Sequence, residues 1–456
     1  MPETIKENKM GTTPIPKLII TMALPMIASM LVQALYNVVD SMFVARLNEE
    51  ALTAVSLAFP VQNLMIAVAA GTGVGVNALL SKSLGEQNFE KANTVAKNGV
   101  LLAVLSAIVF AIVGTFGSRL FFTSQTSDSV IVEYGTQYTF VVTVASIGIF
   151  LQVIYERLLQ STGKTILSMI TQGIGAIVNI ILDPILIFGW FGLPRMEVAG
   201  AAVATVIGQI TAGVVGIILN HRYNKEIHVS FRKFRPSGEI IKNIYKIGAP
   251  SILMQSIGSV TTFGMNNILL MFSATAATVF GVYFKLQSFV FMPVFGLTNA
   301  VIPIVAYNYG AQKKKRIYQT LKLSICFAVS IMLLGLALFQ FIPEVMLGFF
   351  EASAHMLEIG VPALRTISLS FVFAGFCIIV GSVFQALGNG VYSLIISICR
   401  QLLIILPVAY AFAKLFGLNA VWFAYPIAEI ASVILSSILL KKILKDKVKP
   451  LGENHS

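Results

Sequence analysis

An aspartate lies inside a long apolar segment near the N-terminus, on a face that it shares with other polar side chains. The spacing i, i+3, i+4 and i+7 places Gln33, Tyr36, Asn37 and Asp40 on one side of a helix. An ionised carboxylate facing the bilayer core would cost roughly 2.5–3.5 kcal/mol or more. We therefore expect this face to line an enclosed, hydrated cavity, where the carboxyl group exchanges a proton or a sodium ion for a cationic substrate. The alternative for Asp40 is a surface ion pair with Arg46.

A second polar face occurs in the apolar segment that follows residue 163. Gln172, Asn179 and Asp183 recur there at i, i+7 and i+11, and the last two are adjacent on one helical face. The same cost of burial predicts that this face also lines the cavity. Asp183 is therefore the second candidate for proton or cation coupling. The alternative is a structural hydrogen bond at a kink before Pro184.

The chain repeats itself at a constant offset of 225 residues. Leu24-Pro25 corresponds to Ala249-Pro250, Gly85 in SLGEQ to Gly310 in NYGAQ, and QSTG at 160–163 to QALG at 385–388. At this offset Met265 takes the place of Asp40. A polar face survives in the second copy, where it carries Gln255, Ser259, Thr262 and Asn266. Coupling through buried carboxylates is therefore expected in the N-terminal half.

The elements that must position these residues are membrane-spanning helices. Hydrophobic residues make up 56% of the 456, and only 11% are charged, whereas soluble domains are about a quarter charged. A span requires about 20 mostly apolar residues. We predict spans at 17–46, 51–81, 93–117, 130–157, 163–190, 198–221, 240–271, 277–307, 317–342, 356–387, 390–415 and 419–441. The fold class is therefore an all-α membrane protein.

Six spans in each repeat is an even number, so both copies enter the membrane in the same direction. We predict two parallel-repeat six-helix lobes, at 1–221 and 240–456, joined by a basic cytoplasmic linker at 222–239. Transporters with such repeats bind substrate between them. Most of the 32 Lys and Arg fall in alternate loops and in the two ends, which places both termini in the cytoplasm. This distribution explains the net charge of +12 without a nucleic-acid partner.

One proline and three charged residues inside the spans are further candidates for a role in transport. Pro25 removes a backbone hydrogen bond fifteen residues before Asp40, so it is a candidate hinge whose bend responds to ion binding. Lys285, Arg400 and Glu429 lie inside spans of the second half. They either line its cavity or pair with one another.

Several segments together resemble the multidrug and toxic compound extrusion (MATE) family. They include ALPMIASMLVQALYNVVDSMFVARL at 23–47, NIILDPILIFG at 179–189, GAAVATVIGQ at 200–209 and PIVAYNYGAQKKKR at 303–316. The resemblance implies cation-coupled export of cationic and amphipathic compounds. It also implies a proton or Na⁺ site in the N-terminal lobe at Asp40, Asn179, Asp183 and Thr205, with Pro25 as the bend. Some branches of the family carry acids in the seventh and tenth spans, and this sequence lacks them. In this respect it resembles the DinF-like branch.

Other functional classes fit the sequence less well. A lipid-linked precursor flippase of the same superfamily would need a more basic cavity, and it remains the alternative. The sequence contains no HExxH motif, no GxSxG motif and no clustered pair of carboxylates, so a membrane enzyme is not favoured. A receptor or scaffold would leave the buried acids unexplained. No ATP-binding motif occurs, so we expect no cofactor beyond H⁺ or Na⁺ as the coupling ion. The expected setting is the bacterial inner membrane, as a monomer in contact with lipid and small organic substrates.

Overall fold

The computed structural model describes residues 7–232, 234–350 and 352–452, and these residues form helices without strands. The ends of the expected lobes, 1–6 and 453–456, lie outside them. In the first repeat the helices are α1 (Lys9–Thr12), α2 (Ile15–Ala45), α3 (Glu49–Gly85), α4 (Phe89–Gln125), α5 (Ser129–Val144), α6 (Ile147–Ser161), α7 (Thr165–Phe188), η1 (Trp190–Gly192) and α8 (Glu197–Tyr223).

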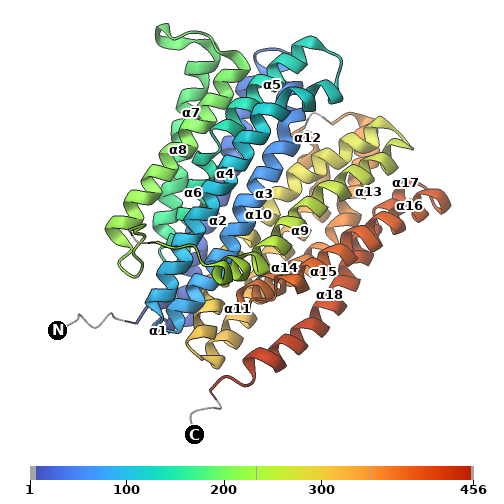
Figure 1. The fold of residues 1–456 in the computed structure, drawn as a ribbon. Helices are drawn as coiled ribbons and strands as arrows, with labels where there is room; N and C mark the ends of the chain where they lie inside the picture. The colour runs from blue at the N-terminus through green and yellow to red at the C-terminus, as the bar shows by residue number, and fades with distance from the viewer. Residues whose placement is uncertain (1–6, 233, 351, 453–456) are drawn as a thin grey trace. The chain divides into compact units, whose positions relative to one another are not determined.

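The second repeat has matching helices and three further short segments. They are α9 (Gly238–Leu270), α10 (Ala274–Gly310), α11 (Lys314–Phe341), α12 (Pro343–Gly348), α13 (Ala354–Ser368), α14 (Phe371–Ala386), α15 (Gly390–Ile398), the π-helical η2 (Cys399–Ile405), α16 (Leu406–Leu415), α17 (Leu418–Val421), α18 (Ala424–Ile443) and η3 (Leu444–Val448). Figure 1 shows these long helices running alongside one another within each half of the chain.

The offset of 225 residues reappears in the helix boundaries. Both ends of α3 and α10 differ by 225, and so do the starts of α4 and α11. Turns repeat as well, because Gln87 has a φ of 55° and Gln312 a φ of 59°. A positive φ is uncommon for a residue other than glycine. The internal repeat predicted from short motifs is therefore confirmed at the level of backbone conformation.

The membrane character of the chain is also confirmed. Among the described residues, nine helices are long and apolar enough to cross a bilayer, and the bent pairs α5–α6 and α13–α14 raise the number to eleven. The pairs bend by 45° and 48° at equivalent places in the two repeats. The remaining expected span, α9, has 33 residues and is long enough to cross. Its polar face makes α9 less apolar than its counterpart α2.

The chain forms two compact units that exchange the ends of their first helices. Unit 1 contains Ala28–Ile252 and the described residues up to Asn8, and unit 2 contains Lys9–Ile27 and the described chain from Leu253 onward. Helix α2 passes from unit 2 to unit 1 after Ile27, and α9 passes from unit 1 to unit 2 after Ile252. These two points again differ by 225. The lobes expected at 1–221 and 240–456, which are defined by the number of spans, stay a prediction.

Close helix contacts inside unit 1 depend on glycine. A Cβ atom at Gly75 of α3 would lie 2.2 Å from the carbonyl oxygen of Ile244 in α9, and one at Gly71 would lie 2.9 Å from that of Gly248. No side chain fits at these distances, so the glycines allow the two backbones to approach each other. The packing of α3 against α9 therefore requires glycine at these two positions.

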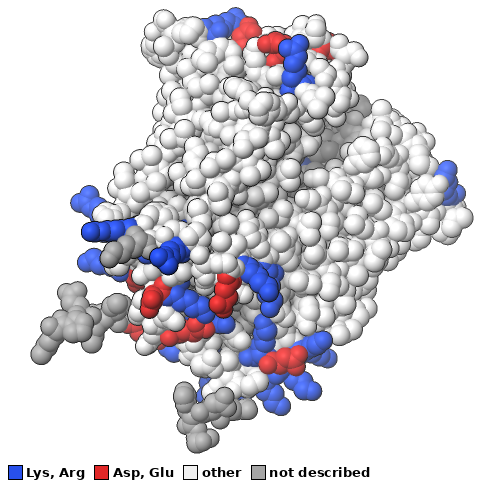
Figure 2. Space-filling model, viewed as in Figure 1, with Lys and Arg blue, Asp and Glu red and all other residues white. Residues whose placement is uncertain are grey.

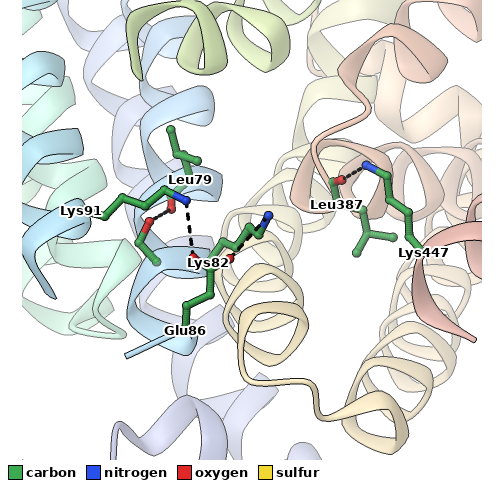
Figure 3. Close-up of polar contacts among 7 residues, drawn as sticks. Leu79, Lys82, Glu86, Lys91, Leu387 and Lys447 are labelled. Carbon is green, nitrogen blue, oxygen red and sulfur yellow. Dashed lines mark hydrogen bonds and ion pairs between the residues drawn. The ribbon is translucent and has the colours of Figure 1, made fainter. Parts of the chain in front are cut away.

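Charged side chains gather at the ends of helices. Figure 2 shows the flanks of the helices almost free of Lys, Arg, Asp and Glu on the face displayed. In unit 1, Glu86 lies 3.6 Å from Lys82 and 3.5 Å from Lys91 (Figure 3). In unit 2, Lys447 donates to the carbonyl oxygen of Leu387 at 2.6 Å. Such partly exposed contacts contribute little to stability, and they leave the flanks apolar for lipid.

Candidate coupling site

The two polar faces predicted from the sequence meet inside unit 1. Gln172 of α7 donates its amide to the side-chain oxygen of Gln33 in α2, at 3.0 Å. Farther along the same helices, the carboxyl groups of Asp40 and Asp183 lie within hydrogen-bonding reach of each other. Helices α2 and α7 therefore bring their polar residues together at two levels.

The two carboxyl groups have few other partners. Asp183 is completely buried, and neither of its carboxyl oxygens receives a hydrogen bond from the described residues; the same holds for Oδ1 of Asp40. Ionised carboxylates only accept hydrogen bonds, so these two can bond to each other only when one carries a proton. With both ionised, their like charges would repel. The pair is therefore suited to hold a proton or another small cation.

Asn179 and Thr205 extend this site to α8. The Asn179 amide donates to Thr205 Oγ1 at 3.2 Å, and both side chains are buried. The helices are close here because a Cβ at Gly208 of α8 would lie 2.7 Å from the carbonyl oxygen of Gly175 in α7. Oδ1 of Asn179 has no donor among the described residues. It is a further oxygen available to a cation one turn before Asp183.

Two residues that the sequence reading missed border the pair. Tyr138 of α5 and Gln62 of α3 are joined by a 2.7 Å hydrogen bond from the Gln62 amide to the Tyr138 hydroxyl. Tyr138, like Tyr36 of α2, lies close to both Asp40 and Asp183. Gln62 is next to Asn63 and Tyr138 follows Tyr134 by four residues, but neither has an aspartate at helical spacing, the feature that identified the other faces. Their polarity inside apolar segments was the available signal.

Neither alternative reading of the aspartates matches the structure. Arg46 lies over the ring of Phe43, 5.8 Å from its centroid, and Asp40 is directed instead toward Asp183. Asp183 precedes Pro184 inside the continuous helix α7, but its oxygens accept no structural hydrogen bond from the described residues. Asn37 is exposed and takes no part in the cluster.

The proposed hinge coincides with a boundary of the fold. Pro25 lies within α2, two residues before the point at which this helix passes from unit 2 to unit 1. Pro250 lies two residues before the equivalent point in α9. Proline lacks the N–H that a helix interior needs, so each crossing follows a weakened turn.

Among its described residues, unit 2 has no equivalent pair of acids. Met265 is fully buried at the position that corresponds to Asp40, while Gln255 is exposed and Asn266 half-buried on the polar face of α9. Of the charged residues that the sequence left open, Arg400 and Glu429 pair with each other at 3.0 Å. Lys285 instead has its Nζ over the ring of Phe350, at 5.8 Å from the centroid.

Comparisons with known proteins agree with this repeat and fold. The MatE family model matches residues 25–185 and 250–411, two stretches that begin 225 residues apart. "Multidrug export protein MepA" of Staphylococcus haemolyticus is 27% identical over 435 residues, covering 92% of this chain and 91% of that protein. MepA of Staphylococcus aureus strain MRSA252 is 28% identical over 451 residues, covering 96% and 95%.

Solved structures show the same fold. An outward-facing multidrug resistance MATE family transporter of the MOP superfamily aligns with a TM-score of 0.91 at 26% identity, over 99% of this chain and 100% of that one. A MOP superfamily transporter from Pyrococcus furiosus is described as having a binding pocket of reverse polarity. It aligns with a TM-score of 0.90 at 26% identity, over 98% of this chain and 99% of that one. MATE structures in a straight and in a bent conformation align with TM-scores of 0.91 and 0.90, respectively.

Proposed function

This chain belongs to the MatE family, and from that premise we propose that it exports small organic cations and amphipathic compounds in exchange for protons or sodium ions. Family membership identifies a transporter rather than an enzyme. Support for multidrug export comes from the MepA relatives, which match almost the whole length of the chain. The coupling ion is a transported substrate and not a resident cofactor.

The observation that carries the proposal is the meeting of Asp40 with Asp183. Asp183 is fully buried and Asp40 half-buried, and a pair of carboxyl groups so placed without a basic partner requires a cation, because two negative charges within reach of each other repel in a medium of low dielectric. A proton satisfies the pair by bridging it. When the ion leaves, the pair attracts another positive charge, and a cationic substrate can take that place. This competition couples exit of the substrate to entry of the ion without a chemical step.

Sodium is the alternative coupling ion at the same place. The carboxylates of Asp40 and Asp183, Oδ1 of Asn179 and Oγ1 of Thr205 are oxygen atoms, which hard cations prefer as ligands. Three of these carboxylate oxygens and the Asn179 oxygen lack a donor among the described residues. The residues therefore fit sodium as well as a proton, and experiment must choose between the ions.

Bending of α2 is the proposed link between ion binding and transport. Asp40 lies in the part of α2 that belongs to unit 1, whereas Pro25 lies in the part that belongs to unit 2. Neutralising Asp40 changes the attraction of one end of the helix for α7, and the weakened turn at Pro25 lets that end move. The straight and bent conformations of a structural neighbour support such a movement.

The setting that we propose is the bacterial cytoplasmic membrane, with both termini in the cytoplasm and the chain acting as a monomer. The excess of Lys and Arg in alternate loops supports this orientation. Placement in the DinF-like branch is supported by Met265 at the position equivalent to Asp40. The flippase alternative is less well supported, because acids without bases line the candidate site of unit 1, and the anionic substrate of a flippase would need the opposite charge.

Transport of a fluorescent cation tests the proposal. Cells that express the protein should accumulate less ethidium than control cells, and Asp40→Asn should abolish the difference because it removes the exchangeable charge. Asp128→Asn is the matched control, since Asp128 is an exposed helix N-cap and asparagine caps equally well. Normal export by Asp40→Asn would refute the assigned role. Collapsing the proton gradient while the sodium gradient is held then identifies the ion.

A further inference from the structure

Unit 2 contains one buried ion pair inside its spans, in the part of the chain that the structure describes. Arg400 of η2 donates from Nη1 to Oε1 of Glu429 in α18, at 3.0 Å. The Glu429 side chain is 9% exposed and that of Arg400 is 23% exposed. A buried pair of this kind costs several kcal/mol of desolvation per ion, so it is weak evidence for stability alone. Its position suggests what else it does.

The pair lies on helices of unit 2 that are equivalent, through the internal repeat, to α7 and α8 of the coupling site in unit 1. At the offset of 225, Arg400 corresponds to Gly175 of α7, and Glu429 corresponds to Ala204 of α8. Ala204 is adjacent to Thr205, and Gly175 lies one turn before Asn179. In both units, therefore, a polar contact joins the fifth and sixth spans of the repeat at nearly the same level. In unit 1 the carboxyl groups there lack a basic partner.

We propose that Glu429 is the carboxylate of a second proton site, which the guanidinium of Arg400 occupies as a tethered counter-ion. Arginine does not lose its proton in proteins, so this positive charge cannot leave as a mobile ion does. Unit 2 consequently takes up no ion while Arg400 is paired. This inference rests on the proposed function only in confining ion exchange to unit 1.

The surroundings of Glu429 favour a proton over a metal ion once Arg400 is removed. Oε2 of Glu429 and the hydroxyl of Tyr425, four residues earlier in α18, are buried without partners. The thiol of Cys377 in α14 lies close to Glu429, and Tyr283 of α10 packs 6.4 Å from Tyr425 between ring centroids. These groups supply few oxygen ligands for a hard cation. They are also the titratable groups that face Glu429 from the helices packed around it.

The local backbone supports a specialised role for Arg400. Residues 399–405 form a π-helix, whereas the equivalent part of α7 is regular α-helix. A π-turn inserts an extra residue and changes the direction of the side chains that follow, and such turns are frequent at functional sites. Arg400 is the second residue of this π-helix.

Substituting Arg400 should turn the occupied site into an open one. In Arg400→Gln, Glu429 loses its counter-ion while remaining buried, so a proton must neutralise it. We expect the melting temperature of the purified variant to be several degrees higher in mildly acidic than in mildly alkaline buffer. The double variant Arg400→Gln/Glu429→Gln keeps a polar pair without charge and should lose this pH dependence. Infrared spectroscopy should detect a protonated carboxyl band in the single variant that is absent from the double variant.

The outcomes distinguish this inference from the proposed function, because melting and infrared spectra need no transport. If Arg400→Gln folds only in acid and the double variant folds in both buffers, the inference holds. If the single and double variants share the same pH dependence and the same infrared spectrum, Glu429 takes up no proton and the inference is overturned. A loss of ethidium export in Asp40→Asn carries no weight in this comparison.

Discussion

Asp183→Asn should stabilise the protein while it abolishes transport. Both carboxyl oxygens of Asp183 are buried without a donor, and the carboxyl group of Asp40 lies within reach. Asparagine has nearly the same shape but adds an N–H donor. A hydrogen bond to a charged group contributes about 1.5–3 kcal/mol, so in alkaline buffer, where the parent pair has released its bridging proton, the variant should gain roughly that much in free energy of unfolding when its amide donates to Asp40.

The same change removes half of the paired acids, so the exchange of ion for substrate should stop. Thermal unfolding of the purified variant measures the gain, and ethidium efflux from loaded vesicles measures the loss. Asp446→Asn is the matched control, because Asp446 is an exposed acid of the C-terminal segment and its loss should change neither quantity. A variant that is less stable than the parent and still exports ethidium would refute the reasoning.

The remaining predictions concern packing, caps and the ion ligands. Gly75→Ala should lower the free energy of unfolding by about 1–3 kcal/mol, because the added methyl group overpacks against Ile244. Gly173→Ala has open space around its Cβ and should raise it by up to about 1 kcal/mol. Melting temperatures that shift in opposite directions would confirm both. Asn48→Ala and Ser273→Ala remove equivalent N-caps of α3 and α10, and thermal unfolding should show similar losses of about 1 kcal/mol. Thr205→Val leaves the Asn179 amide without its acceptor, so ion-driven efflux should require a higher ion concentration.

The pairing of α2 with α7 was predictable because helical spacing can be read directly from residue types. Gln33, Asp40, Gln172 and Asp183 fall at intervals that place them on helix faces, and the cost of burying a carboxylate makes those faces converge. The offset of 225 residues was likewise visible in short motifs. It reappears in helix ends and in the φ angles of Gln87 and Gln312.

Other features depend on contacts between distant segments, which one sequence does not contain. The exchange of helix ends after Ile27 and Ile252 is set by packing partners rather than by a change in composition. Tyr138 and Gln62 have no aspartate at helical spacing to draw attention to them. Arg400 pairs with Glu429 across two helices, and no spacing pattern in the sequence links these two residues.

Competition between ion and substrate tests the central claim most directly. Binding of ethidium to the purified protein can be followed by fluorescence anisotropy while the concentration of protons or of sodium is raised separately. If both ligands use the carboxyl groups of Asp40 and Asp183, one of the two ions should weaken ethidium binding in the parent protein and have no effect in Asp40→Asn. Ethidium binding that is indifferent to both ions in the parent protein would contradict the account.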